Sequence, residues 1–195
     1  MPIAPPSHQP SAQLRFSVSD YHRMAEAGVF GPEARIELLD GHLYAMSPIG
    51  SQHAACVRRL NRLFAAETTP NEALISVQNP IALSPHSEPE PDLALLKPRD
   101  DDYAARHPRA DEVLLVVEVA DTTLTFDREV KVPLYAQAKI PLVWVVAPAE
   151  DQVYTYQKPS DGTYTIQSTC TRGDALPVPD EVVSSSIPVD RVLLT

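Results

Sequence analysis

Two acidic residues interrupt segments that are otherwise almost wholly apolar. Asp92 stands directly before the run "LALL", and Glu118 lies near the end of "VLLVVEVA". Continuous apolar runs predict strands that are covered on both faces of a sheet. If the two strands are antiparallel neighbours, the start of one lies beside the end of the other, and the two carboxylates meet at one sheet edge. Like charges in a buried site repel each other unless a cation joins them, so the pattern indicates a site for Mg²⁺ or Mn²⁺.

Lys131 is the next candidate for this site. It follows Glu118 by thirteen residues, near the start of the next predicted helix, so its ammonium could reach back over the strand end. There it could orient an attacking water or stabilise a developing negative charge. In that role Lys131→Ala would abolish cleavage and leave the melting temperature nearly unchanged. The alternatives are a structural ion pair with the carboxylates and a solvated helix lysine.

Three other polar residues have both a functional and a structural interpretation. Glu37 could complete the acidic cluster, or it could pair with Arg35, which shares its strand face. His53, near the start of a helix predicted over residues 51–66, could shuttle a proton or contact phosphate, or serve the fold alone. Gln78 could likewise project toward the site. These residues are therefore secondary candidates.

The helix predicted over residues 128–138 carries positions to which we assign structural roles. Tyr135 lies four residues after Lys131, on the same helical face, and is expected to pack in the core. Asp127 with Arg128 is expected to cap and flank the start of the helix. Catalysis is expected to depend on Asp92, Glu118 and Lys131, with Glu37 as a secondary candidate.

The net charge of −10 argues against a general nucleic-acid binder, which usually carries a basic surface. Arg58, Arg59 and Arg62 form the densest basic cluster and lie on the polar face of the helix over residues 51–66. They are candidates for contact with nucleic acid, with a solvated helix face as the alternative. A role on DNA would therefore rely on this cluster, on metal ions or on a partner.

The elements that must position these residues follow from periodicity and turn signals. A capped helix is expected over residues 16–28, and an Asp-Gly hairpin over residues 35–47. Three apolar strands, short strand pieces near residue 79 and a second hairpin around Asp161-Gly162 complete the pattern. Helices that alternate with buried strands predict an α/β fold, in which helices pack against a central mixed sheet.

Length and composition are those of an ordinary single-domain protein. The 195 residues suffice for one domain, placed at residues 14–195, and the proline-rich start predicts a disordered tail over residues 1–13. No apolar run approaches the roughly 18 residues of a membrane span, and no secretory signal is visible. Cys56 and Cys170 show no metal or redox spacing and are expected to be reduced, which fits a cytoplasmic protein.

The order of several motifs resembles one known family. The stretches "ELLDGHLYAMSP", "SEPEPDLALL" and "LLVVEVADTTLTFDREVKVPLYAQAKIPLVWVV" are similar to those of the Uma2 endonuclease family, a branch of the PD-(D/E)XK restriction-endonuclease-like superfamily. The resemblance implies an α/β/α core with a C-terminal β-hairpin, in which Asp92 and Glu118 bind metal and Glu37 is the upstream acid. The chain departs from the pattern at Ala120, where the superfamily carries its lysine. Lys131 is then the displaced lysine, supplied by the following helix.

Residues and resemblance together predict an endonuclease that hydrolyses DNA phosphodiester bonds with Mg²⁺ or Mn²⁺. Asp92 and Glu118 would hold the ion, Lys131 would position water or neutralise the transition state, and Glu37 would assist. Two alternatives stay open. One is a catalytically inactive module of the same fold that binds a partner or forms a homodimer, and the other is a metal-dependent hydrolase of a smaller phosphoester.

Overall fold

The computed structural model describes residues 13–31, 33–182 and 186–194. Its centre is a six-stranded sheet in the order β3-β4-β5-β6-β7-β8. Neighbouring strands are antiparallel except β5 and β6, which are parallel. The strands are β3 Leu74–Val77, β4 Leu93–Leu96, β5 Val113–Val119, β6 Leu142–Ala147, β7 Gln152–Ser160 and β8 Thr163–Thr171. The prediction of an α/β fold around a central mixed sheet is confirmed.

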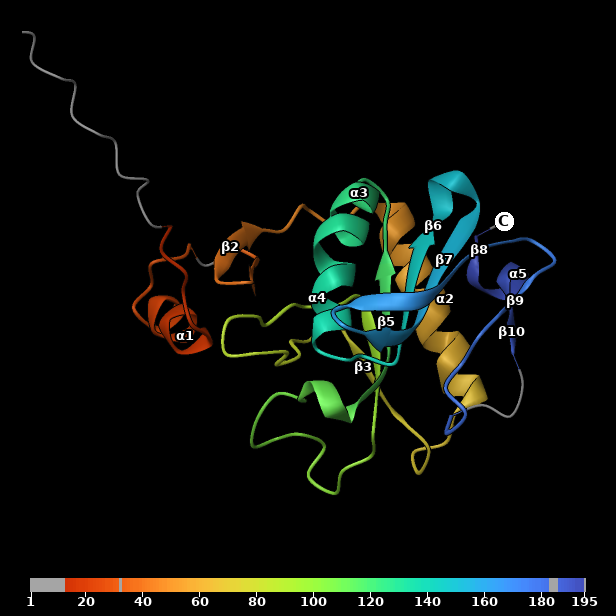
Figure 1. Ribbon diagram of the computed structural model, residues 1–195, viewed down its shortest axis with the longest axis horizontal. Coiled ribbons are helices and arrows are strands. Elements are labelled where there is room, and N and C mark those ends of the chain that lie inside the picture. The colour runs from red at the N-terminus through yellow and green to blue at the C-terminus, as the bar shows by residue number, and fades with distance from the viewer. Residues whose placement is uncertain (1–12, 32, 183–185, 195) are drawn as a thin grey trace, which may run out of the picture.

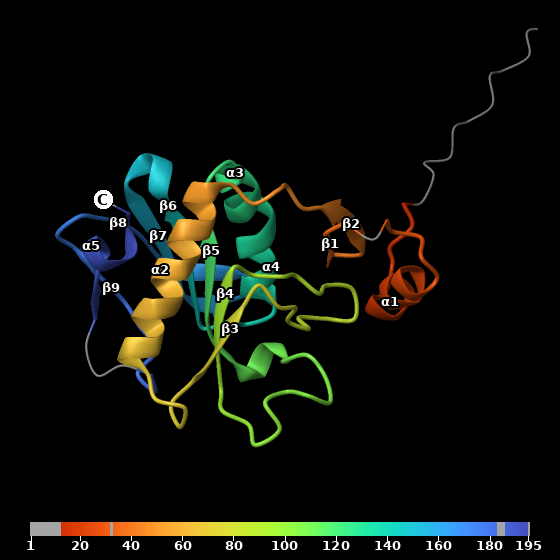
Figure 2. The same ribbon diagram turned by 180° about the vertical axis from the view of Figure 1, so that it is seen from behind.

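Helices cover both faces of this sheet (Figures 1 and 2). Helix α2, Ser51–Glu67, packs on one face together with the short C-terminal helix α5, Val189–Val192. The helical segment between β5 and β6 packs on the other face. Strands β4, β5 and β6 are buried at every position, because both of their faces meet helices. This explains why their sequences are apolar runs and do not alternate.

The first helix and the first hairpin form an arm that stands beside the main body (Figure 1). This N-terminal arm contains α1 Val18–Glu26, β1 Ile36–Leu39 and β2 His42–Ala45, and β1 and β2 form a two-stranded sheet separate from the central one. Asp40 and Gly41 have φ angles of 48° and 79°, as a two-residue hairpin turn requires. Backbone hydrogen bonds of the 85–88 segment hold the arm to the body. The antiparallel pairing of β1 with β2 confirms the predicted hairpin and places it outside the central sheet.

The helix after β5 begins earlier than predicted and is not a regular α-helix. It runs through α3 Leu124–Phe126, a π-helical turn Asp127–Lys131 and α4 Val132–Gln137. Pro133 has no N–H to donate to the carbonyl four residues before it, and its ring crowds that carbonyl. The chain responds with the wider turn, in which Val132 N–H reaches back five residues to the carbonyl of Asp127.

The C-terminal part extends the body. The predicted second hairpin is confirmed as β7–β8, with Asp161 and Gly162 at positive φ, and it continues the central sheet as two further strands. Two short strands, β9 Ala175–Leu176 and β10 Ile187–Pro188, pair with each other. The predicted tail lies outside the described residues, apart from residue 13. Among those described, both cysteines are free, and no helix has the length and apolar character to cross a membrane.

Candidate active site

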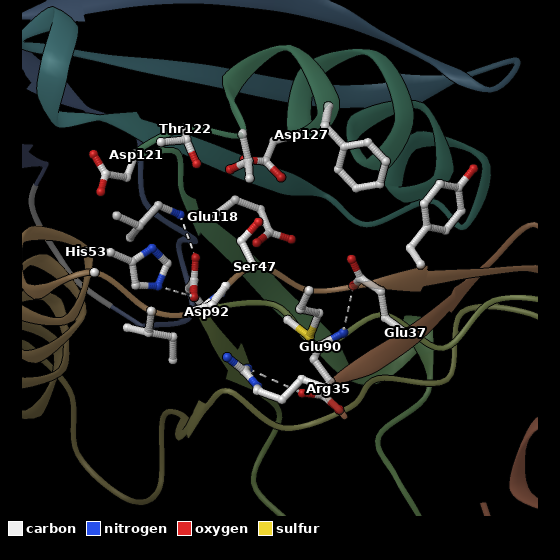
Figure 3. Close-up of a pocket in the computed structure, with 18 of the residues that line it drawn as sticks. Arg35, Glu37, Ser47, His53, Glu90, Asp92, Glu118, Asp121, Thr122 and Asp127 are labelled. Carbon is white, nitrogen blue, oxygen red and sulfur yellow. Dashed lines mark hydrogen bonds and ion pairs between the residues drawn. The ribbon is translucent and has the colours of Figure 1, made fainter. Parts of the chain in front are cut away.

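The two acidic residues that interrupt the strands meet at one sheet edge (Figure 3). Leu93 pairs with Val117, so the same register places Asp92 opposite Glu118. Asp92 Oδ2 accepts a hydrogen bond from the backbone N–H of Val119 at 2.8 Å, which ties the start of β4 to the end of β5. The antiparallel neighbourhood predicted from the apolar runs is therefore present in the structure.

Glu118 is fully enclosed in protein, with an exposed fraction of 2%. Its Oε1 accepts a hydrogen bond from the hydroxyl of Tyr135 at 2.5 Å and lies 3.3 Å from Lys131 Nζ. Burial raises the pKa of Glu118 to about 8, against the opposing effect of Lys131; the negative charges of Asp127, Asp92 and Glu37 add to the rise. Burial and these neighbouring carboxylates thus both disfavour the ionised form of Glu118.

Lys131 lies between two carboxylates and is 5% exposed. Its Nζ is 3.1 Å from Glu37 Oε2 and 3.3 Å from Glu118 Oε1. Burial lowers the pKa of Lys131, but the attraction of Glu118, Glu37 and Asp127 outweighs this and raises it above the usual range. The ammonium is thus permanently charged and part of a buried ion-pair network. The expectation that Lys131→Ala leaves the melting temperature unchanged does not fit this burial.

His53 and Gln78 both contact Asp92. His53 Nε2 lies 2.8 Å from Asp92 Oδ1, and Gln78 Nε2 donates to the same oxygen at 3.3 Å. The hydrogen bond to Asp92 raises the pKa of His53, although burial works in the opposite direction. Asp92 is therefore held by Gln78 just after β3, by His53 of α2 and by Val119 of β5, which fixes its orientation at the mouth of β4.

The three acids of "SEPEPD" have three different partners. Glu88 lies 2.6 Å from His22 Nε2 on helix α1, and Glu90 lies 3.6 Å from Arg35. Asp92 alone of the three belongs to the edge with Glu118. Arg35 thus pairs with Glu90, which removes the alternative of an Arg35–Glu37 pair and leaves Glu37 with Lys131 as its cation.

Asp127 lines the site, and the capping role assigned to it from sequence is wrong, whereas Tyr135 packs in the core as predicted and in addition contacts Glu118. Asp127 is 4% exposed, accepts a hydrogen bond from Thr123 Oγ1 at 2.6 Å and faces the same cavity as Glu118. Tyr135 does more than pack, because its hydroxyl binds Glu118. The sequence signal was the spacing of Asp127, Lys131 and Tyr135, which four-residue steps place near one face of a helix.

These groups open into one cavity of about 250 Å³. The charged part of its lining, which we call the charged wall, has two permanent cations, Arg35 and Lys131, and six carboxylates. The carboxylates are Glu37, Glu90, Asp92, Glu118, Asp121 and Asp127. The cavity lining also has an apolar part, which we call the apolar wall; its residues come from the arm, the 46–49 segment and α3. There the rings of Tyr44 and Phe126 lie with centroids 5.1 Å apart and planes tilted by 58°. Neither ring was a candidate from sequence.

The three arginines of α2 do not line this cavity. Arg58 and Arg62 are exposed, whereas Arg59 is half-buried and donates a hydrogen bond to the carbonyl of Leu193. Arg59 therefore has a structural partner. Contact of Arg58 and Arg62 with nucleic acid stays a prediction.

The donor set is compatible with a hard divalent cation. Among the described residues, no group of three or more His, Cys, Asp or Glu side chains is arranged as a metal site. Asp92 and Glu118 offer two carboxylates on rigid strand ends, which is the protein share that Mg²⁺ commonly takes before water and phosphate oxygens complete its shell. Burial is the main cause of the raised pKa of Glu118, and the neighbouring carboxylates add to it; a bound cation would offset the charge of those carboxylates.

A mixed sheet between helices, with carboxylates at adjacent strand ends and a buried lysine, defines a nuclease-like α/β domain. The chain belongs to the Uma2 family, described as "Putative restriction endonuclease", which matches residues 18–190. One solved structure, from Anabaena variabilis ATCC 29413, is described as "a putative nuclease belonging to DUF820". It superposes with a TM-score of 0.69 at 12% identity, over 91% of this chain and 97% of that chain, which shows the shared fold. No curated protein matches the chain. The family resemblance stated from the motifs is confirmed.

Proposed function

We propose that this protein is a metal-dependent nuclease that hydrolyses phosphodiester bonds of DNA, with Mg²⁺ or Mn²⁺ held by Asp92 and Glu118. The observation that carries the proposal is the meeting of these two carboxylates with the Lys131 ammonium at one cavity wall. Membership of a family described as restriction endonucleases supports the same reaction class.

The side chains divide the work by their positions. A bound divalent ion would polarise the phosphate and lower the pKa of an attacking water. Lys131 supplies a fixed positive charge beside Glu118, where it can orient water or stabilise the negative charge of the transition state. Glu37 holds that ammonium from the other side, and His53 holds Asp92. Burial of these contacts keeps the groups in place before substrate arrives.

Cleavage of supercoiled plasmid DNA tests the proposal. The parent should nick plasmid with Mg²⁺ or Mn²⁺ and not with EDTA, and Asp92→Asn and Glu118→Gln should lose this activity. Asp111→Asn is a matched control, because Asp111 is exposed and lies outside the cavity. Cleavage that survives Asp92→Asn would refute the assignment.

Metal binding is measured separately by melting. At a hundredfold excess over its dissociation constant, a metal that binds only folded protein stabilises it by about 2.7 kcal/mol, or about 5–11 °C at this size. Asp92→Asn should lose most of this gain but still fold, because an asparagine oxygen can accept the Val119 N–H. Metal stabilisation with hydrolysis of a small phosphodiester and no DNA cleavage would favour the smaller-substrate alternative. The absence of both metal stabilisation and hydrolysis would favour the alternative of a catalytically inactive binding module.

A further inference from the structure

The cavity is lined by both charged and apolar side chains, and a nucleotide likewise has a charged phosphate and an apolar base. Asp92, Glu118 and Lys131 lie on the charged wall, and Tyr44 and Phe126 lie on the apolar wall. Met46 and Ile49 extend the apolar wall, and Ile49 is 44% exposed. Rings and aliphatic groups beside a phosphate-directed site match the base and sugar of one nucleotide.

The aromatic pair leaves ring surface available. Tyr44 comes from β2 of the arm and Phe126 from α3 of the body, and both side chains are half-buried. Because their planes are tilted by 58°, the two rings do not cover each other face to face.

The same cavity is poorly suited to a double helix. Its volume of about 250 Å³ lies just below the range of about 300–1,000 Å³ for small-ligand sites. Both permanent cations in its lining are already paired, Arg35 with Glu90 and Lys131 with Glu37 and Glu118. A duplex would need basic side chains along two backbones, and its bases are already stacked on one another.

We infer that Tyr44 and Phe126 are specificity-determining residues that stack an unpaired base, so that the site acts on single-stranded or locally unpaired DNA. The inference rests on the proposed function, because a phosphate can face Asp92 and Glu118 only through the cation that they would hold. The recognised unit is a nucleotide whose base lies on the aromatic wall and whose phosphate faces Asp92 and Glu118.

Oligonucleotide binding with Ca²⁺ in place of Mg²⁺ tests this without cleavage. Fluorescence anisotropy compares a labelled single strand, the duplex of the same sequence, and the single strand with abasic positions. The parent should bind the normal single strand most tightly. Tyr44→Leu and Phe126→Leu should each weaken it by about 5-fold to 150-fold, the range expected for loss of one stacked base.

Matched variants separate stacking from folding. Tyr44→Phe keeps the ring and should retain parent affinity, and Tyr154→Leu removes a partly exposed tyrosine that lies outside the cavity. Tyr44→Leu should not weaken binding of the abasic strand further, because that strand lacks the base on which the Tyr44 ring would stack. Equal affinity of the parent for normal and abasic strands, or for single strand and duplex, would overturn the inference. If a mononucleotide competes with an affinity equal to that of the single strand, the nucleotide pocket would be supported, and its ligand would be a free nucleotide.

Failure of this inference is distinct from failure of the proposed function. Suppose that plasmid cleavage depends on Asp92 but is unchanged by Tyr44→Leu, and that loss of the base has no effect. The protein would then still be a nuclease, and the rings of Tyr44 and Phe126 would have no role in recognition. If binding depends on the base but no metal supports cleavage, the nucleotide pocket would be supported and the proposed nuclease reaction refuted.

Discussion

Lys131→Met tests whether the buried ammonium holds the acidic cluster together. Its contact with Glu37 at 3.1 Å, and its contact with Glu118 at 3.3 Å once that carboxyl is ionised, are each worth about 5 kcal/mol at an effective dielectric constant of about 20, before desolvation. Desolvation offsets much of this, and removal of one partner from a buried pair costs about 3–5 kcal/mol. For a chain of this length, the melting temperature should fall by about 6–20 °C.

The loss should depend on pH, with a sign set by Glu118. Its pKa, raised by burial from 4.5 to about 8, means that the folded protein holds this proton more tightly than the unfolded chain. The contribution of Glu118 to the free energy of unfolding therefore falls as pH rises from 4.5 to about 8. Without Lys131 the pKa of Glu118 rises further. The difference in melting temperature between parent and variant should be larger at about pH 9 than at about pH 6.

Melting curves in EDTA measure the effect without metal. Lys97→Met is the control, because Lys97 is exposed and the same substitution there should change the free energy of unfolding by no more than about 0.5 kcal/mol. Adding Glu118→Gln to Lys131→Met should restore part of the loss, since it removes a stranded charge. If Lys131→Met melts with the parent at both pH values, the reasoning about the ion-pair network is refuted.

Three further changes test other parts of the molecule. Tyr135→Phe removes the donor to Glu118 and should lower the free energy of unfolding by about 1.5–3 kcal/mol in urea titrations; no change would show that the bond is not stabilising. The hydrogen bond with Arg106 is the main cause that lowers the pKa of Glu112 from its ordinary value of 4.5 to about 2, so the stabilisation by Glu112 is present above pH 4.5 and is lost as pH falls toward 2. Glu112→Gln should therefore be less stable than the parent at neutral pH, and acid titration should bring the two together. If Arg58 and Arg62 contact a single strand, replacing both by Gln should reduce the slope of log affinity against log salt by about 1.4, and an unchanged slope assigns them to solvent.

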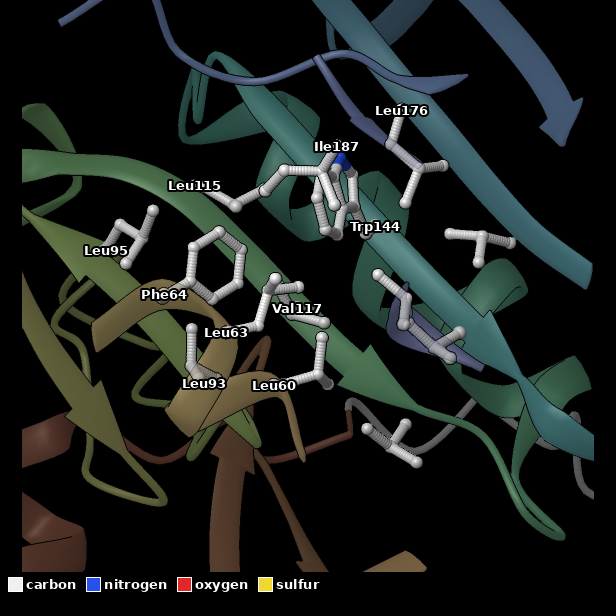
Figure 4. Packing of buried hydrophobic residues seen from close by; sticks show 14 of the residues in the cluster. Leu60, Leu63, Phe64, Leu93, Leu95, Leu115, Val117, Trp144, Leu176 and Ile187 are labelled. Atoms are coloured by element: carbon white, nitrogen blue, oxygen red, sulfur yellow. The ribbon is translucent and has the colours of Figure 1, made fainter. Parts of the chain in front are cut away.

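The strands and one edge of the site were accessible from sequence because their signals are local. A strand buried on both faces must be apolar throughout, and the core between α2 and the sheet shows the result, with Phe64 and Trp144 packed against leucines of β4 and β5 (Figure 4). A charge in such a run is conspicuous, which is how Asp92 and Glu118 were found.

The rest of the site depends on contacts between distant segments. The pairing of Glu37 with Lys131 joins the arm to the helix after β5, and no local pattern specifies it. Asp127 was assigned to a helix cap because the helix was predicted to begin at residue 128, whereas it begins at Leu124. The aromatic wall combines Tyr44 with Phe126, and the two become neighbours only when the arm packs on the body.

The π-helical turn sets the rotational phase of the helix that follows it. Each residue of an α-helix turns the chain by about 100° and advances it by about 1.5 Å. Deletion of one residue inside the turn would therefore swing Lys131 and Tyr135 away from Glu118 together, while a change of length in the 121–123 loop before the helix could leave their phase intact. A lysine supplied in this way is located by helical phase and not by its distance along the chain from the acid. Variation in loop length among relatives should consequently be tolerated before the helix and excluded within the turn.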